Sequence, residues 1–193
     1  MRAKINSYWM GINQCFYDLD PKLMEQVVMQ MSKRGRTIFI VGNGGSALTA
    51  SHMALDFNKW TRVKGLPNLR AISLTDSIGS ITAWANDATY QDIFREQLVN
   101  LLKAGDLVIG ISASGKSMNV LKAIQYAKDH GAFTIGFSGF GGGTLANMAD
   151  IAIVSSSENY GVIEDFHMSL GHILAQFIKT FREGDERWAE ASL

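Results

Sequence analysis

The sequence has a single cysteine, Cys15, so the chain can form no internal disulfide and offers no cysteine cluster for a metal ion. It has no run of about eighteen apolar residues, and its first residues lack the continuous apolar stretch of a secretory signal. Eighteen basic and eighteen acidic residues cancel, so no overall charge would attract a polyanion. We therefore expect a cytoplasmic protein with no membrane and no nucleic-acid partner.

The first 34 residues are predicted to be entirely helical. Apolar residues recur there at three- and four-residue steps from Ile5 to Phe16. One of only two prolines, Pro21, follows Asp20 in the arrangement of a helix cap and a first helical residue, and Gly35 is expected to close the second helix. These helices carry more apolar surface than one edge of a sheet would need, so we expect subunit contacts at residues 1–34.

Beyond the helical segment, short apolar runs alternate with stretches of helical spacing. Strands are expected at 37–41, 70–74, 107–111, 133–137 and 151–154. This alternation is typical of the α/β class and predicts a three-layer α-β-α sandwich around a five-stranded parallel sheet. At this length we expect a single domain over residues 1–193, with a substantial core.

Two loops rich in glycine and serine each follow a predicted strand and precede a predicted helix. They are Gly42-Asn43-Gly44-Gly45-Ser46 and Ser112-Ala113-Ser114-Gly115-Lys116-Ser117. Such loops present free backbone N–H groups, hydroxyls and the positive end of a helix to an anion. Two of them in one parallel sheet predict a site that holds the phosphate group of a small molecule.

Neither loop fits a nucleotide site well. The first loop matches a dinucleotide-binding pattern at Gly42, Gly44 and Ala47, but the acidic candidate Asp76 lies too far along the chain for that unit. Lys116 does not stand in the spacing of a nucleotide-hydrolysing loop. The phosphorylated ligand is therefore expected to be something other than a nucleotide.

Two pairs of side chains could carry chemistry. His52 and Asp56 are four residues apart on the helix after the first loop and share a face, while Glu164 and His172 are eight apart on the last predicted helix. Facing each other, they would suit a divalent metal such as zinc, or proton transfer. Spacing alone leaves open a purely structural role for the histidines.

A further polar pair, Asn86-Asp87, follows Trp84. It could cap the next helix, or it could line a polar pocket and bind sugar hydroxyls. The residues alone do not choose between these two roles.

Taken in order, these motifs resemble the SIS (sugar isomerase) domain family and, within it, the phosphoheptose isomerases. The similarity runs from the N-terminal helices to about residue 180. It is carried by residues 42–47 with His52, by Ser73-Leu74-Thr75-Asp76, by Asn86-Asp87, by residues 110–121 and by the glycines of 139–143.

The resemblance implies an enzyme of carbohydrate metabolism that interconverts sedoheptulose 7-phosphate and D-glycero-D-manno-heptose 7-phosphate through an enediol. It also implies a homotetramer with sites between subunits. The substrate-binding positions that it implies are Asn43, Gly44, Ser46, Asn86, Asp87, Ser112, Ser114, Ser117 and Glu164.

The resemblance further implies a Zn²⁺ site at His52, Asp56, Glu164 and His172. Asp56 stands where the family has a glutamate that is its proposed base, and Glu164 stands where it has a glutamine. Both replacements keep an oxygen donor, so metal binding remains chemically reasonable, although they leave open whether zinc is retained. We assign Asp56 as the catalytic base and His172 as the acid.

The same departures are compatible with a second function. Asp56 is one methylene shorter than glutamate, and a misplacement of about 1 Å in a proton-transfer group can cost roughly a hundredfold in rate. The alternative is a non-catalytic SIS protein that binds a sugar phosphate or a protein partner, as a replication-initiator-binding relative does. The retained histidines and oxygen donors favour the isomerase.

Overall fold

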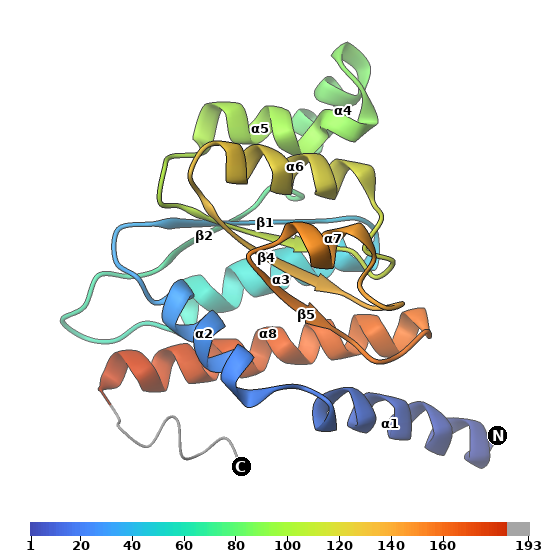
Figure 1. Cartoon of the computed structure of the whole chain (residues 1–193). Coiled ribbons are helices and arrows are strands. Elements are labelled where there is room, and N and C mark those ends of the chain that lie inside the picture. The colour runs from blue at the N-terminus through green and yellow to red at the C-terminus, as the bar shows by residue number, and fades with distance from the viewer. Residues whose placement is uncertain (185–193) are drawn as a thin grey trace.

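The computed structural model describes residues 1–184, and its centre is a five-stranded parallel sheet with helices on both faces (Figure 1). The order across the sheet is β2-β1-β3-β4-β5. The strands are β1 (Thr37–Gly42), β2 (Arg70–Ser73), β3 (Leu107–Ile111), β4 (Phe133–Ser138) and β5 (Ile151–Val154). The predicted fold class is confirmed. Residues 185–193 of the single domain expected over 1–193 lie outside the described residues.

Eight α-helices and one 3₁₀ turn surround the sheet in the described part of the chain. They are α1 (Arg2–Tyr17), α2 (Pro21–Met31), α3 (Gly45–Lys59), α4 (Ile78–Asp87), η1 (Tyr90–Asp92), α5 (Ile93–Leu101), α6 (Met118–Asp129), α7 (Gly143–Met148) and α8 (Tyr160–Glu183). Among residues 1–184, no helix is both long and apolar enough to cross a bilayer.

The central strands are buried on both faces because helices cover both sides of a parallel sheet. All residues of β1 and β3 are buried. Alternate residues of β1 serve opposite cores: Ile38 and Ile40 pack with α2, α3 and α8, whereas Phe39 and Val41 pack with α5, α6 and α7. Continuous apolar runs in the sequence are the direct consequence of this double burial.

The helices form two layers, with α5, α6 and α7 on one side of the sheet and α2, α3 and α8 on the other (Figure 1). Helix α1 contacts α8 on its outer side, and α4 projects beyond the layer of α5 and α6 (Figure 1). No residue of α4 is buried.

The N-terminal segment differs in detail from the prediction of continuous helix. A break at residues 18–20 separates α1 from α2, and α2 ends at Met31 rather than near Gly35. The predicted cap is confirmed, because Asp20 Oδ1 accepts a hydrogen bond from the backbone N–H of Lys22 at 2.9 Å. Only part of the apolar stripe of α1 is covered: Ile12 is buried, while Trp9 is 59% exposed.

The carboxyl ends of β1, β3 and β4 meet at one edge of the sheet. Gly42 is in register with Ile111, and Ile111 with Phe137. Just beyond the strands, Ser112 N–H donates to the Phe137 carbonyl at 2.9 Å, so the loop after β3 continues along β4. The two predicted serine-rich loops therefore start side by side.

Candidate active site

A cavity of about 180 Å³ lies where the two loops meet. Its lining includes every serine predicted to contact phosphate. The lining residues are Asn43, Ser46, Ile111, Ser112, Ala113, Ser114, Ser117, Tyr160 and Glu164. Two loops about seventy residues apart in sequence thus share one small polar cavity.

The second loop is held in shape by its own hydroxyls. Ser112 Oγ donates to Ser117 Oγ at 3.0 Å, and Ser114 Oγ accepts from the Lys116 N–H at 3.3 Å. Ser117 is the N-cap residue of α6, so the positive end of that helix points toward the cavity. Gly115 has φ +64°, and a Cβ there would overlap the Gly142 carbonyl, which requires glycine at this turn.

Helix α3 starts directly at the first loop. Gly44 precedes it with φ +54°, and Ser46 lies in its first turn. No lysine or arginine is among the described residues that line the cavity. Attraction for an anion would therefore come from hydroxyls, backbone N–H groups and the ends of α3 and α6.

Glu164 lies in this cavity as well. A Cβ on Gly45 would come within 2.5 Å of Glu164 Oε1, so the carboxylate packs directly against the first loop. Glu164 therefore shares a cavity with the predicted phosphate-binding serines, and its role in substrate binding stays a prediction. It is separated along α8 from His172, its predicted partner in a metal site.

Asn43 is fixed by residues that spacing did not single out. Its side-chain amide forms a reciprocal pair with Asn119, at 2.8 and 2.9 Å, and its Oδ1 also accepts from the Tyr90 hydroxyl at 3.1 Å. Asn119 lies two residues beyond Ser117, a proximity that could have indicated its role.

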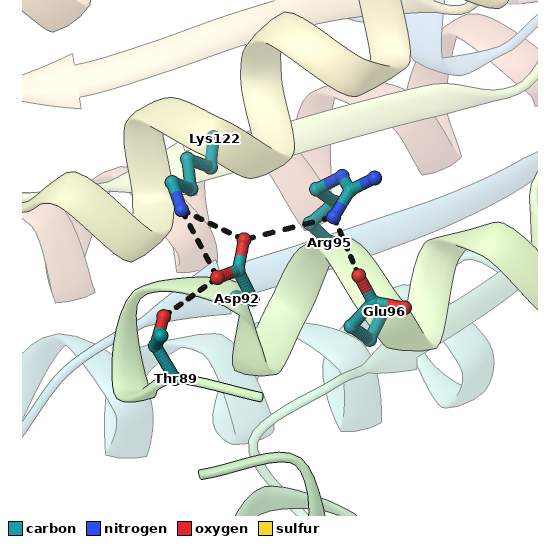
Figure 2. A network of polar contacts seen from close by, with 5 residues as sticks. All are labelled: Thr89, Asp92, Arg95, Glu96 and Lys122. Carbon is teal, nitrogen blue, oxygen red and sulfur yellow. Dashed lines mark hydrogen bonds and ion pairs between the residues drawn. The ribbon is translucent and has the colours of Figure 1, made fainter. Parts of the chain in front are cut away.

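Tyr90 belongs to η1, which is tied down by the network in Figure 2. There the Asp92 carboxylate lies between Lys122 of α6 and Arg95 of α5, with Thr89 below it (Figure 2). Lys122 Nζ donates to both Asp92 oxygens, at 2.8 and 3.0 Å. The hydrogen bonds from Lys122 and Thr89 lower the pKa of Asp92. The turn that carries Tyr90 is thus anchored to the helix that begins at the cavity.

Asn86 and Asp87 are the last two residues of α4, and both are exposed in the single chain. Asn86 Nδ2 donates to Asp87 Oδ1 at 2.8 Å. Because η1 and α5 begin after Thr89 and Asp92, neither residue caps the next helix, and that interpretation is wrong. Their role as sugar-binding residues stays a prediction.

A second cluster brings together His52 and Asp56 of α3 with His172 of α8. Asp56 Oδ2 lies 3.0 Å from His172 Nδ1 and 3.3 Å from His52 Nε2. The two imidazole rings meet edge to face with centroids 4.9 Å apart. The Asp56 side chain is only 5% exposed, whereas those of His52 and His172 are 42% and 37% exposed.

The close packing of α3 on α8 depends on Gly171. A Cβ at this position would lie 2.7 Å from Cγ of Met53, a buried residue of α3. Trp60, just past the end of α3, flanks the cluster with its ring centroid 5.9 Å from that of His172. The absent side chain at residue 171 allows His172 to reach Asp56.

The ligand atoms of His52, Asp56 and His172 all lie within 4.8 Å of one another. Two imidazole nitrogens and one carboxylate oxygen form a donor set that suits zinc with a position open to substrate. The sequence predicted four ligands on facing pairs. The structure gathers three of them and sets Glu164 in the serine cavity.

The chain is similar to known proteins over most of its length. The SIS domain family matches residues 22–139. A phosphoheptose isomerase of Thermodesulfovibrio yellowstonii is 41% identical over 159 residues, covering 82% of this chain and 78% of that protein. A phosphoheptose isomerase structure from Francisella tularensis has a TM-score of 0.82 at 30% identity, covering 92% of this chain and 97% of that one. One from Neisseria gonorrhoeae has a TM-score of 0.83 at 27% identity, covering 93% and 96%.

The parallel sheet, the serine-rich loops at its carboxyl edge and the His–Asp cluster beside them define a sugar isomerase domain. Most of the chain takes part in these similarities, and the residues matched by the family include both serine-rich loops and helix α3. The chain belongs to the SIS domain family and, within it, to the phosphoheptose isomerases, and it is an isomerase.

Proposed function

We propose that the chain interconverts sedoheptulose 7-phosphate and D-glycero-D-manno-heptose 7-phosphate. The relatives named phosphoheptose isomerase support this substrate. So does the pairing of a small hydroxyl-lined cavity with a separate acid–base cluster. One end of the sugar is held by its phosphate, and the reacting carbons lie toward the cluster.

The serine cavity binds the phosphate in this proposal. Ser46, Ser112, Ser114 and Ser117 donate hydroxyl hydrogens, and the start of α6 adds its dipole. Binding energy gained at a group that does not react orients the open-chain sugar for the chemical step. Glu164, Asn86 and Asp87 accept hydrogen bonds from sugar hydroxyls.

The observation that carries the proposed chemistry is the 3.0 Å separation of Asp56 Oδ2 and His172 Nδ1. Asp56 takes the proton from the carbon next to the carbonyl, which gives the 1,2-enediol, and returns it to the neighbouring carbon. His172 moves the proton between the two oxygens. Burial of Asp56 keeps bulk water from its carboxylate, so the abstracted proton is retained for the return step.

His52, Asp56 and His172 are the residues that would hold a zinc ion. When bound there, such an ion would supply Lewis-acid polarisation of the substrate oxygens, which would favour loss of the neighbouring proton. We propose Glu164, the fourth ligand predicted from the sequence, as a further oxygen ligand that would have to turn its carboxylate from the serine cavity toward this cluster.

We further propose a cytoplasmic homotetramer of chains that each form one domain over residues 1–193. The exposed apolar side chains of α1, Ile5, Trp9 and Met10, are suited to subunit contacts at residues 1–34. The open face of the cluster, where His52 and His172 are partly exposed, is suited to completion by a neighbouring subunit. The alternative of a non-catalytic binding protein is disfavoured by the intact cluster and by the family.

The deciding experiment incubates the purified protein with sedoheptulose 7-phosphate, with and without added Zn²⁺, and identifies the products. We expect the aldose 7-phosphate to form and to equilibrate with the ketose. Absence of product under both conditions, from protein that still binds the sugar phosphate, would support the non-catalytic alternative.

A further inference from the structure

A second cavity, of about 220 Å³, lies at the opposite edge of the sheet from the candidate active site. Its walls come from the turn between α2 and β1, from the segment 66–69 before β2, and from the end of α8. The turn leads into β1 at Thr37, whereas the serine cavity lies beyond Gly42 at the other end of that strand. The two cavities share no lining residue.

This second cavity is strongly cationic. Lys33, Arg34, Arg36 and Arg182 line it, and none of its described lining residues is acidic. Within residues 1–184, none of these four side chains forms an ion pair, although Arg95, Lys122, Lys128 and Lys179 elsewhere all do. In a chain with equal numbers of acidic and basic residues, four cationic side chains without an ion pair among the described residues thus line this one cavity.

Burial lowers the pKa of Arg36, and the nearby carboxylate of Asp106 partly offsets this by raising it, so Asp106 compensates part of the charge of one lining arginine. The two oxygens of this carboxylate accept hydrogen bonds from the backbone N–H groups of Thr37 and Lys103, at 2.7 and 2.8 Å. Burial lowers the pKa of Arg182, and the adjacent charge of Arg34 lowers it further. The guanidinium groups of Arg34 and Arg182 repel each other in this cavity, and an anion bound between them would stabilise both.

Two polar atoms of the lining residues lack partners. Arg182 donates through Nη2 to the Pro67 carbonyl, but its Nη1 is buried with no hydrogen-bond partner among the described residues. The same is true of Ser32 Oγ. Buried donors are normally satisfied, because an unmade hydrogen bond is costly. Both residues line the same cavity, so one ligand rich in acceptor oxygens could satisfy both.

We propose that this cavity binds a phosphate-bearing small molecule at a site separate from the active site. Arginine side chains bind tetrahedral oxyanions through charge-assisted hydrogen bonds. Of the three arginines that line the cavity, Arg36 already donates through Nη1 to the Gln30 carbonyl and Arg182 through Nη2 to the Pro67 carbonyl, which leaves their other N–H groups and the Arg34 guanidinium for an anion. Helix α8 runs from Glu164 at the active cavity to Arg182 here. The separation along this helix is about 27 Å.

The test measures binding of inorganic phosphate by isothermal titration at about 0.15 M ionic strength, where long-range surface attraction is screened. A Ser112→Ala/Ser114→Ala background weakens the active cavity and isolates the second site. In this background we expect Arg34→Gln to weaken phosphate binding roughly tenfold or more. Arg34 is exposed and forms no side-chain hydrogen bond among the described residues, so the variant should fold normally.

The matched control is Arg2→Gln, the same change of charge on the exposed start of α1. It should leave phosphate binding unchanged. Equal affinity in the Arg34→Gln and Arg2→Gln proteins would overturn the proposal. So would a phosphate-soaked crystal in which phosphate lies in the serine cavity and not beside Arg182. Because binding rather than turnover is measured, the result does not depend on the proposed isomerase reaction.

Discussion

A single carboxylate oxygen, Oδ2 of Asp56, faces the Nδ1 atom of His172 at 3.0 Å. The two residues lie on different helices, α3 and α8, and are 116 positions apart in the sequence. It places a buried carboxylate beside a partly exposed imidazole, a pair suited to the proton transfer proposed between adjacent substrate atoms.

Replacing this oxygen should separate chemistry from binding. We expect Asp56→Asn to lower kcat for sedoheptulose 7-phosphate roughly a hundred- to ten-thousand-fold, because the amide cannot accept the substrate proton. The proposed phosphate site is a separate cavity, so the affinity for the sugar phosphate should change little. Steady-state kinetics and direct binding measure the two effects, with Asp129→Asn on exposed α6 surface as control. Full activity in Asp56→Asn would rule out the assigned base.

Bound metal should depend on the His–Asp cluster. We expect purified protein to carry zinc in proportion to chains, and His52→Ala to lose most of it, since one of three clustered ligands is removed. Elemental analysis after dialysis measures the content. His130→Ala is the matched control, because this histidine stacks on Tyr126 away from the cluster. Equal zinc content in the two variants would contradict a metal site at His52.

The serine cavity should govern substrate affinity. We expect Ser112→Ala to raise KM for the sugar phosphate about tenfold, because the hydroxyl proposed to donate to the charged phosphate is lost. Ser7→Ala, on the exposed face of α1, should leave KM unchanged. An unchanged KM in Ser112→Ala would place the phosphate elsewhere.

Acid should destabilise the protein through His167. This side chain is buried between Phe137 and Phe166, and burial lowers its pKa to about 4. In the unfolded chain His167 takes up a proton at about pH 6.5, whereas in the folded chain it does so only near pH 4. The stability of the folded state is therefore independent of this group above about pH 6.5 and decreases as the pH falls from there toward 4. The loss amounts to about 3 kcal/mol.

Urea unfolding between pH 7 and pH 4 would measure this loss. His167→Gln should flatten the pH dependence in that window, whereas His130→Gln, at an exposed position, should keep it. Parallel curves for the wild type and His167→Gln would contradict the assignment.

The Asp92–Lys122 contact should matter for both stability and binding. The hydrogen bond from Lys122 lowers the pKa of Asp92, so its contribution is present above the ordinary pKa of an aspartate and is lost as the pH falls through the lowered value. We expect Lys122→Met to cost about 1 kcal/mol at neutral pH. We also expect a several-fold rise in KM, since η1 carries the Tyr90 that holds Asn43.

Lys128→Met is the matched control, because Lys128 makes a similar ion pair with Asp150 at the other end of α6. It should affect stability and leave KM unchanged. Equal KM values in the Lys122→Met and Lys128→Met proteins would show that the network has no influence on the cavity.

The sheet and its loops could be predicted from sequence because their causes are local. Apolar runs such as Thr37–Val41 follow from burial on both faces, and the strand ends fall within one residue of the prediction at Gly42 and Ser138. The serine loops follow directly from where those strands end. Spacing also paired His52 with Asp56 correctly, since both lie on one turn of the same helix.

The remaining features depend on contacts between distant segments. Glu164 and His172 share α8, but their spacing does not reveal how each is placed. Gly45 leaves room for the Glu164 carboxylate, and Gly171 lets α8 pack closely enough on α3 for His172 to reach it. Asn86 and Asp87 were compatible with a cap until the end of α4 was located. The cationic cavity joins three segments that no pattern in the sequence connects.

The missing side chain at Gly171 gives the protein a simple evolutionary constraint. Even a methyl group there would press on Met53 and force the last helix outward, and the imidazole on the next residue would move with it. The distance between Asp56, the proposed proton acceptor, and His172 therefore depends on Gly171, a residue that has no functional group of its own. Variation at residue 171 should be tolerated only where a smaller side chain replaces Met53.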